Sequence, residues 1–589
     1  MEIDDVIKKA KEYLLLESNP EFKKQIQDLL EKNDLVELNE RFSTELAFGT
    51  GGIRGIIGGG YSRLNSFIIR KTTQGLANYI KKAVPLQRAS AVIAFDSRHF
   101  SDAFAREAAE VLCGNGITTY LFSTLRPTPE LSFAVRYLKA TAGIVVTASH
   151  NPSEYNGYKV YWSDGGQIVS PQDKNIVEEV RKVDGQAIVS LTKEQAISQG
   201  LLKIIDKEID KPFIEMIKRQ SLRPDLVREQ GRMLKVVYTP LYGAGAIPVE
   251  KALSEMGIRV VFVEEQRQPN GDFPTVQFPN PEEASAMKMA LDLAKKEKAD
   301  LVMGTDPDAD RLGIAIPSGE EYVLITGNQL GALLLDYIVS TRKEMGTLPA
   351  NAVVIKTIVT TELQRLIAQD HQVQCIDVLT GFKYIAEKIH EFESGQKDGA
   401  FLFGAEESYG FLTGTDVRDK DAVSSATMTA EMALFHRSQG GSVIGRLTAL
   451  FEKYGYFEEA LVSKYFKGEK GMQIMAGLMT SLRSRPPMVI DGKPVVLVKD
   501  YKMRRAYNPK EISKTTAIDL PSSDVLQFFR ADESIITIRP SGTESKIKFY
   551  ISCRCRPDMP LPEARRETGA KIASIKQEIN AIIEEAANE

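Results

Sequence analysis

The chain repeats one strand–helix–strand pattern three times, and this repetition restricts its fold more than any other feature of the sequence. The first copy has an apolar strand at 91–95 (AVIAF), a helix at about 101–113 and a second strand at 117–122. The other copies begin at 234–238 (LKVVY) and at 352–355. In each copy the two strands start about 20–26 residues apart, which is typical of parallel strands joined by a right-handed helical crossover. We therefore expect three α/β domains of similar design.

The rest of the chain follows other patterns. Residues 2–40 are rich in Lys, Glu and Leu and are expected to be helical. After about residue 440, apolar strands near 494–498, 534–538 and 546–553 and a terminal helix from about Pro562 indicate a smaller α+β domain. The predicted domains are 1–208, 209–325, 326–440 and 441–589.

Composition and charge disfavour several classes of function. The formal net charge is -4, so there is no basic excess that would indicate binding to nucleic acid. No apolar run approaches the ~18 residues that span a bilayer, and the acidic residues 1–5 are unlike a signal peptide. Cys553 and Cys555 have no second cysteine pair with which to bind zinc, which favours structural thiols in a reducing compartment. We expect a cytoplasmic protein that binds neither nucleic acid nor membrane.

Three carboxylates, Asp306, Asp308 and Asp310, follow the strand expected at 299–303. Like charges this close together are unfavourable unless a cation lies among them, and oxygen ligands favour Mg²⁺ or Ca²⁺. An EF-hand is excluded because its sixth and twelfth positions would be Arg311 and Pro317. Three carboxylates leave coordination sites open, as they are where Mg²⁺ also contacts a phosphate. The alternative is a solvated acidic turn.

A second group of polar residues, Ser149-His150-Asn151-Pro152, follows the apolar strand expected at 144–147. Ser149 and His150 suggest a serine hydrolase, but adjacent residues in a strand point to opposite faces, so His150 is expected to be poorly placed as a direct base. The G-x-S-x-G elbow of many hydrolases is also absent. We instead expect Ser149 to carry a phosphoryl group, whose charge would pair with Mg²⁺ and with Lys159.

Three further segments have the composition of ligand-binding loops. The 538–546 segment combines Arg539 with Ser541, Gly542 and Thr543, which suits an anion-binding turn, although a charged hairpin turn is the alternative. The glycine-rich 49–55 segment is expected to be a flexible backbone that carries Arg54 close to an anion. The 403–410 segment places Glu406 and Ser408 among small residues, which suits a polyol, although a polar loop capping a helix is the alternative.

Four of these segments together resemble the signature loops of the α-D-phosphohexomutase family. They read TASHNPSEYNGYK, GTDPDADR, GAEESYG and RPSGTES, in the order that the family has them. The resemblance spans roughly residues 40–555. The segment TELAFGTGGIRG and the chain length are most similar to the long phosphoglucomutase/phosphopentomutase subgroup. The resemblance implies three similar mixed α/β domains and a smaller C-terminal α+β domain around a central cleft.

The resemblance also implies roles for individual residues. Ser149 would be the phosphorylated nucleophile, and it would bind Mg²⁺ together with Asp306, Asp308 and Asp310. The side chains expected near the transferred phosphoryl group are those of Arg54, His150, Lys159 and Lys420. Those expected to bind the sugar are Glu406, Ser408 and, within the 381–383 loop, Lys383. The non-reacting phosphate would be held by Arg539, Ser541, Gly542 and Thr543.

The activity that the resemblance implies is a reversible transfer of phosphate between C1 and C6 of glucose, with glucose 1,6-bisphosphate as intermediate and activator. Phosphopentomutase and phosphomannomutase activities are the nearest alternatives. Mannose-accepting members carry Gly-His after the Glu-x-Ser motif, whereas this chain has Tyr409-Gly410, which disfavours mannose. A Mg²⁺-dependent sugar phosphatase and a non-catalytic sugar-phosphate sensor are alternatives of other classes. We expect a sugar-phosphate enzyme that is a monomer or a weak homodimer.

Overall fold

The structure, a computed structural model, describes the whole chain except residues 1–2, 47, 50, 467, 541–545 and 589. Its residues form two compact units, neither of which is continuous in sequence. The first unit contains residues 1–330 and 382–440, and the second contains residues 331–381 and 441–589. Each unit has an apolar core of its own.

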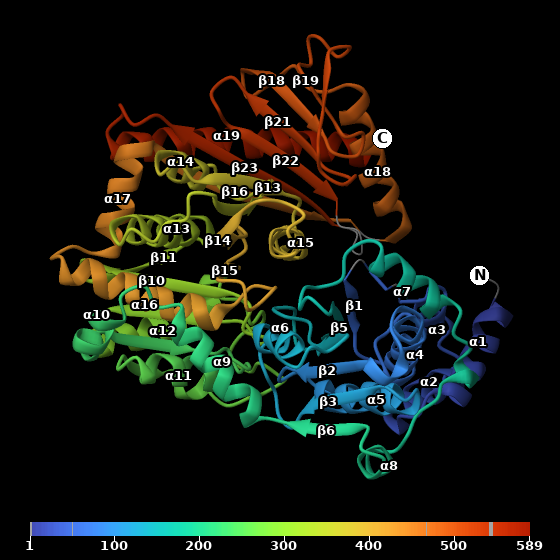
Figure 1. The fold of residues 1–589 in the computed structure, drawn as a ribbon. Helices are drawn as coiled ribbons and strands as arrows, with labels where there is room; N and C mark the ends of the chain where they lie inside the picture. Colours follow the sequence, from blue (N-terminus) through green and yellow to red (C-terminus); the bar gives the residue numbers. More distant parts are fainter. Residues whose placement is uncertain (1–2, 47, 50, 467, 541–545, 589) are drawn as a thin grey trace. The chain divides into compact units, whose positions relative to one another are not determined.

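The helical segment at the start of the first unit comprises three helices, which are α1 (Ile3–Leu16), α2 (Pro20–Glu31) and α3 (Leu35–Phe42). Asn19 and Asp34 begin the second and third of these helices, because each side chain accepts a hydrogen bond from a backbone N–H in the first turn. Tyr13 packs edge-on against Phe42 and Phe67. These helices therefore share a core with the first sheet, and Figure 1 shows them beside α4.

The first sheet has six strands in the order β1-β5-β4-β2-β3-β6. Strands β2, β3, β4 and β6 run parallel, as the crossover spacing predicts, but β5 is reversed and pairs antiparallel with both of its neighbours, β4 and β1. The 147–154 loop between β4 and β5 is too short for a helical crossover, so the chain returns antiparallel and the sheet is mixed. The strands are β1 (Gly52–Ile56), β2 (Ser90–Phe95), β3 (Thr118–Phe122), β4 (Ala142–Val146), β5 (Tyr155–Trp162) and β6 (Leu202–Ile205). The helices are α4 (Ser66–Ala83), α5 (Ser101–Gly114), α6 (Thr128–Tyr137), α7 (Gln172–Arg181) and α8 (Lys193–Ser198), with 3-10 turns η1 (Leu86–Arg88) and η2 (Gly185–Ala187).

The glycine-rich segment is not the flexible loop that the sequence suggested, because residues 52–56 form the edge strand β1. Gly52 has φ +148°, and a Cβ at this position would lie 2.0 Å from the Tyr158 carbonyl oxygen of β5. Glycine is therefore needed here for the close approach of two strands.

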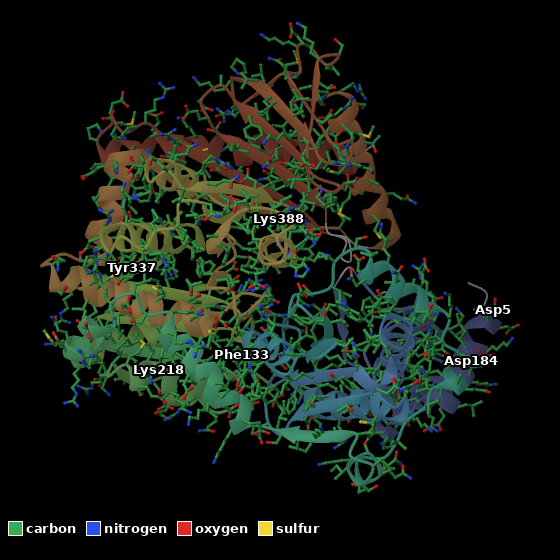
Figure 2. All side chains as sticks on the ribbon, viewed as in Figure 1. Asp5, Phe133, Asp184, Lys218, Tyr337 and Lys388 are labelled. Carbon is green, nitrogen blue, oxygen red and sulfur yellow. The ribbon has the colours of Figure 1, made fainter. Side chains whose placement is uncertain are left out.

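The second sheet of the first unit has the order β11-β10-β9-β7-β8. Strands β7, β8 and β9 are parallel, and the β9–β10–β11 meander is antiparallel. The strands are β7 (Lys235–Thr239), β8 (Arg259–Phe262), β9 (Leu301–Thr305), β10 (Leu312–Ser318) and β11 (Glu321–Ile325). The helices are α9 (Lys207–Arg219), α10 (Pro224–Gln230), α11 (Ala246–Glu255) and α12 (Ala284–Glu297), with 3-10 turns η3 (Gly231–Met233) and η4 (Glu264–Gln266). Helix α9 packs against α6 of the preceding segment, where the ring of Phe133 lies 5.6 Å from that of Phe213 (Figure 2).

Residues 382–440 return to the first unit as α15 (Phe382–Glu393), the antiparallel pair β14 (Ala400–Ala405) and β15 (Phe411–Thr413), and α16 (Ala422–Ser438). Helix α16 is almost entirely buried. Its start is fixed by Asp421, whose side chain accepts hydrogen bonds from the N–H groups of Val423 and Ser424.

The second unit contains the third copy of the repeated pattern and the C-terminal sheet. The third copy is β12 (Ala352–Thr357), α14 (Leu363–Asp370) and β13 (Gln374–Val378), and its strands pair in parallel. Helix α13 (Gly327–Glu344) leads into this copy, and α17 (Val443–Tyr454) follows in the same unit. The C-terminal sheet has the antiparallel path β16-β23-β22-β21-β18-β19-β20, with β17 paired to β18. Its elements are β16 (Tyr456–Tyr465), α18 (Gly468–Ser484), β17 (Val489–Ile490), β18 (Lys493–Asp500), β19 (Arg505–Tyr507), β20 (Thr515–Ala517), β21 (Leu526–Arg530), β22 (Ile535–Pro540), β23 (Lys546–Cys555) and α19 (Leu561–Asn588).

The helices and the cysteines bear on two predictions, which concern membrane spans and the state of the thiols. Among the described residues, none of the helices combines the length and the apolarity needed to cross a membrane. Cys553 and Cys555 are both buried on β23 and carry free thiols. Burial raises the pKa of the Cys553 thiol to about 11, so it stays protonated and unreactive at neutral pH.

Candidate functional site

The candidate site forms where the ends of β4 and β9 meet within the first unit. Ser149 follows β4, and Asp306 follows β9, 157 residues later in the sequence. The Ser149 hydroxyl donates a hydrogen bond of 2.7 Å to Oδ2 of Asp306. The structure therefore joins the two segments that the sequence singled out separately.

The relation between Ser149 and His150 differs from the one expected from strand alternation. Strand β4 ends at Val146, and Ser149 has φ +53°, in the left-handed region. Because the backbone has left the strand, the two adjacent side chains turn toward each other, and Ser149 Oγ lies 3.2 Å from His150 Nδ1. The expectation that His150 is poorly placed to act on Ser149 is wrong.

The three carboxylates are buried and lie close together. Asp306 and Asp308 are 0% exposed and Asp310 is 2% exposed, with one oxygen from each within 4.8 Å of the others. Asp306 Oδ1 accepts hydrogen bonds from the backbone N–H groups of Asp310 and Arg311, which shapes the loop. Burial, together with the negative charges of Asp308 and Asp310, raises the pKa of Asp306 well above its usual value.

This carboxylate cluster fits a divalent cation. Within the described residues, Oδ1 of Asp308 and Oδ1 of Asp310 are buried and have no hydrogen-bond partner. Buried carboxylate oxygens that lack partners are costly unless a cation binds them. The site therefore offers hard oxygen ligands of the kind that Mg²⁺ prefers.

Two lysines lie against the carboxylates. Lys159 Nζ, on β5, is 2.7 Å from Asp308 Oδ2 and 3.3 Å from Asp310 Oδ2. Lys420 Nζ is 3.2 Å from Asp310 Oδ2 and 3.0 Å from Asp419 Oδ1. Burial alone would lower the pKa of each lysine, but the neighbouring carboxylates raise both pKa values, so both lysines are charged at neutral pH.

Models of phosphoglucomutase and phosphomannomutase α/β/α domains I, II and III match residues 45–187, 211–319 and 326–454, in that order. The chain belongs to the phosphoglucomutase/phosphomannomutase family. The predicted family is therefore confirmed. The predicted fold class is confirmed as three α/β/α domains followed by a sheet-rich C-terminal domain. The predicted domain boundaries stay predictions.

Individual members of the family are similar over most of their length. A phosphoglucomutase of Staphylococcus aureus (strain MRSA252) is 36% identical over 562 residues, which cover 95% of this chain and 96% of that protein. The open form of parafusin, a phosphoglucomutase from Paramecium, matches with a TM-score of 0.66 at 15% identity, covering 92% of this chain and 95% of that one. The N-acetylphosphoglucosamine mutase of Aspergillus fumigatus, solved with GlcNAc-6P and magnesium, matches with a TM-score of 0.50 at 12% identity, covering 97% and 99%.

In this phosphoglucomutase/phosphomannomutase family member, Arg54 lies next to the Ser149 loop. Arg54 is exposed on β1, and its guanidinium donates a hydrogen bond of 2.9 Å to Oδ1 of Asn151. Strand β1 pairs with β5, which carries Lys159, so these two neighbouring strands at the sheet edge supply two cationic side chains to the site.

The residues predicted to bind the sugar lie on the 382–440 segment. Glu406 is 6% exposed at the end of β14, where burial raises its carboxyl pKa against the opposing charge of Lys420. Ser408 follows in the turn and is partly buried. Lys383 is the second residue of α15, where burial lowers the pKa of its amine. Phe382, next to Lys383, has its ring 5.5 Å from Lys420 Nζ, which brings the start of α15 to the lysine of the site.

The residues predicted to bind the distal phosphate belong to the second unit. Arg539 lies near the end of β22, where it pairs with Lys548 of β23. Ser541, Gly542 and Thr543 lie outside the described residues. Their phosphate-binding role stays a prediction.

Three residues that contact the site are not predicted from the sequence. Thr128, at the start of α6, donates a side-chain hydrogen bond of 2.9 Å to Asp308 Oδ2. Asp419 accepts a hydrogen bond of 2.7 Å from Tyr161, which fixes the carboxylate that lies against Lys420. Arg98 donates to the backbone of the Ser149 loop. The only sequence signal for Arg98 is its position directly after an apolar strand, where binding residues gather in α/β sheets.

Proposed function

We propose that this protein is a phosphoglucomutase that interconverts glucose 1-phosphate and glucose 6-phosphate through a phosphorylated Ser149. The observation that supports the proposal most directly is the 2.7 Å hydrogen bond from Ser149 Oγ to Asp306 Oδ2. A phosphate on Ser149 would replace this hydrogen bond with charge repulsion between the two groups. Such a pair is stable only when cations lie beside it, and the carboxylate cluster and lysines of the site suit that arrangement.

The predicted cofactor is Mg²⁺. It would be held by Asp306, Asp308 and Asp310 together with the Ser149 phosphate, and it would supply positive charge that stabilises the transferring phosphoryl group. The orphaned oxygens of Asp308 and Asp310 support this assignment.

The side chains around Ser149 have separate tasks in the transfer. When the sugar hydroxyl takes the phosphoryl group, the bond between Ser149 Oγ and phosphorus breaks, and a bond from phosphorus to the sugar oxygen forms. The net proton movement is from the sugar hydroxyl to Ser149 Oγ, and His150 Nδ1, 3.2 Å from that oxygen, is placed to hold the proton there. Lys159 and Lys420 remain charged and would stabilise negative charge on the phosphoryl oxygens. Arg54 orients the loop through Asn151.

The remaining predicted residues would serve the other end of the sugar. Glucose 1,6-bisphosphate would form first and then exchange its two ends, so that Ser149 recovers the second phosphate. Glu406, Ser408 and Lys383 would bind the sugar hydroxyls during both steps. Arg539 with Ser541, Gly542 and Thr543 would hold whichever phosphate is not reacting.

The first experiment compares Ser149→Ala with Ser153→Ala, which removes the hydroxyl of another serine in the same loop. Intact mass spectrometry after incubation with glucose 1,6-bisphosphate measures phosphorylation, and a coupled assay measures conversion of glucose 1-phosphate. We expect wild type and Ser153→Ala to gain one phosphate and to be active, whereas Ser149→Ala does neither. Full mutase activity in Ser149→Ala would overturn the mechanism.

A second assay tests the substrate. The ratio of kcat/KM on glucose 1-phosphate, ribose 1-phosphate and mannose 1-phosphate distinguishes the proposed activity from phosphopentomutase and phosphomannomutase. We expect the glucose phosphate to be preferred. Release of inorganic phosphate without any need for the bisphosphate would instead favour a sugar phosphatase.

A further inference from the structure

One buried arginine, Arg98, donates hydrogen bonds to the backbone of the loop that carries Ser149. Arg98 follows β2, and it is 3% exposed. Its guanidinium donates to four carbonyl oxygens of the loop, at 2.5 Å to Ser149, 2.5 Å to Asn151, 2.7 Å to Pro152 and 3.0 Å to Tyr155. A single planar donor group therefore sets the path of the 149–155 backbone.

Asp96 completes this support. Its carboxylate lies 3.3 Å from Arg98 Nε and accepts a hydrogen bond of 2.6 Å from the Thr147 hydroxyl. The Thr147 hydroxyl oxygen in turn accepts a hydrogen bond of 2.7 Å from the Ser149 N–H. Asp96 therefore fixes the Ser149 amide through the Thr147 hydroxyl, and Arg98 fixes the Ser149 carbonyl directly. This matters because Ser149 has φ +53°, a conformation that a non-glycine residue adopts only when its surroundings enforce it.

Arg98 also contacts a loop next to the second sheet, the sheet whose strand β9 leads to Asp306. The Phe273 ring lies 5.0 Å from the Arg98 guanidinium carbon, and the neighbouring Asp272 is 2.7 Å from His99 Nε2. A Cβ at Gly271 would lie 2.8 Å from the His99 backbone nitrogen, so the two segments are in close contact.

The 270–275 segment is fixed in turn to strand β7. The Gln266 side chain donates a hydrogen bond of 2.8 Å to the Thr275 hydroxyl. It accepts a hydrogen bond of 2.6 Å from the hydroxyl of Thr239, the last residue of β7. Strand β7 pairs with β9, the strand that leads to Asp306. A chain of contacts therefore runs from the Ser149 loop through Arg98 and Phe273 to the strands beneath the carboxylates.

We propose that Arg98 is a positioning residue for phosphoryl transfer, which holds Ser149 in register with the carboxylate cluster without touching the substrate. The inference rests on the proposed function, because it assigns Arg98 a part in transfer from Ser149. Lysine at this position would keep the charge but could not bind four carbonyl oxygens in one plane. Displacement of a reacting group by about 1 Å lowers a rate by about 100-fold.

The test compares Arg98→Lys with Arg267→Lys. Arg267 is a matched control because its guanidinium also lies over an aromatic ring, at 4.1 Å from that of Phe262, and is paired with Glu250. We expect kcat for glucose 1-phosphate to fall about 100-fold in Arg98→Lys, with KM changed less than about 3-fold. Arg267→Lys should keep the wild-type kcat. A wild-type kcat in folded Arg98→Lys, or a change confined to KM, would overturn the proposal.

Hydrogen exchange of the 149–155 amides tests the geometry independently of activity. These amides should exchange at least about 10-fold faster in Arg98→Lys than in wild type, while those of β2 keep their protection. If wild type proves to lack mutase activity but the exchange difference appears, the proposed function fails and the structural support stands. Unchanged exchange in a less active variant would instead remove Arg98 as the cause.

Phe273→Leu provides a second variant in case Arg98→Lys does not fold, because it leaves the buried charges intact. We expect its kcat to fall by about 3- to 10-fold, with faster exchange in the same loop, because the ring no longer faces the guanidinium. Wild-type kcat together with wild-type exchange in Phe273→Leu would overturn the link between Arg98 and the second sheet.

Discussion

At the residue scale, Gly410 leaves space for the Lys420 side chain because glycine has no Cβ. A Cβ at this position would lie 2.1 Å from Lys420 Cδ and 2.7 Å from its Cγ. The lysine cannot move aside freely, because its Nζ contacts Asp310 and Asp419. The glycine at position 410 therefore has a steric reason in the position of Lys420.

Gly410→Ala is expected to displace Lys420 and to lower kcat by about 10-fold or more, since the cation that we propose stabilises the transferring group would move away. Steady-state kinetics on glucose 1-phosphate provides the measurement. Gly569→Ala is the control, because apart from the adjacent backbone of its own helix, α19, no described heavy atom lies within 4 Å of a Cβ there. A Gly410→Ala enzyme with wild-type kcat would show that Lys420 has no part in transfer.

Sequence identifies a candidate ligand site where one segment carries a composition that needs a ligand, and it misleads where dihedral angles or distant partners decide. Asp306, Asp308 and Asp310 were found because three carboxylates in five positions repel one another. The three carboxylates lie together in the structure, and their metal-binding role stays a prediction. The contact between Ser149 and His150 was misjudged because it depends on a left-handed φ that no residue type in the segment announces. Thr128 has no sequence signal because it reaches Asp308 from a helix 180 residues earlier, and Asp419, although adjacent to the predicted Lys420, is revealed only by its contacts with Tyr161 and Lys420.

At the element scale, the strand–helix–strand copies are predictable from the sequence, and the pairing of the edge strand β1 is not. Strands β2, β7 and β12 are short apolar runs bounded by polar loops, so the 20–26-residue spacing places their crossovers. Strand β1 consists mostly of glycine and isoleucine at a sheet edge, and its pairing with β5 follows from close packing rather than from an apolar pattern.

Helices α4 and α5 provide a prediction about pH. Glu107 of α5 accepts a hydrogen bond from the Ser66 hydroxyl at the start of α4, and within the described residues its other oxygen is buried without a partner. Burial, with a smaller contribution from Glu17, raises the Glu107 pKa to about 7. The folded state therefore binds this proton more tightly than the unfolded state does. Its contribution to stability is fully present below about pH 4.5 and is lost as the pH rises toward 7.

Glu107→Gln should therefore be more stable than wild type at pH 7.5, by at most about 3 kcal/mol, and similar to it at pH 4.5. Urea denaturation at several pH values measures the difference in the free energy of unfolding. A difference that does not change between pH 4.5 and 7.5 would contradict the assignment of the raised pKa to Glu107.

At the scale of the whole molecule, the carboxylate cluster belongs to the first unit alone. Among the described residues, the carboxylates of Asp306, Asp308 and Asp310 are the cluster suited to a metal. A ligand stabilises only the part of a protein whose folding creates its site. The two units should therefore respond differently to Mg²⁺.

Mg²⁺ at 100 times its dissociation constant is expected to stabilise the first unit by about 2.7 kcal/mol. Hydrogen exchange with and without EDTA should show slower exchange in β9 with the metal, and unchanged exchange in β18 of the second unit. Asp308→Asn should weaken the response in β9. Equal protection of β9 and β18 by Mg²⁺ would place the effect outside the carboxylate cluster.

The discontinuity of the first unit has a consequence for the order in which the protein is made. Chains leave the ribosome N-terminus first and domains generally fold as they emerge. Ser149 and the carboxylates precede residue 330, but Asp419 and Lys420 follow a segment that belongs to the other unit. A chain synthesised only as far as residue 330 therefore contains Ser149 and the carboxylates but not Lys420, and the first unit can be completed only after the 331–381 segment of the other unit has been made.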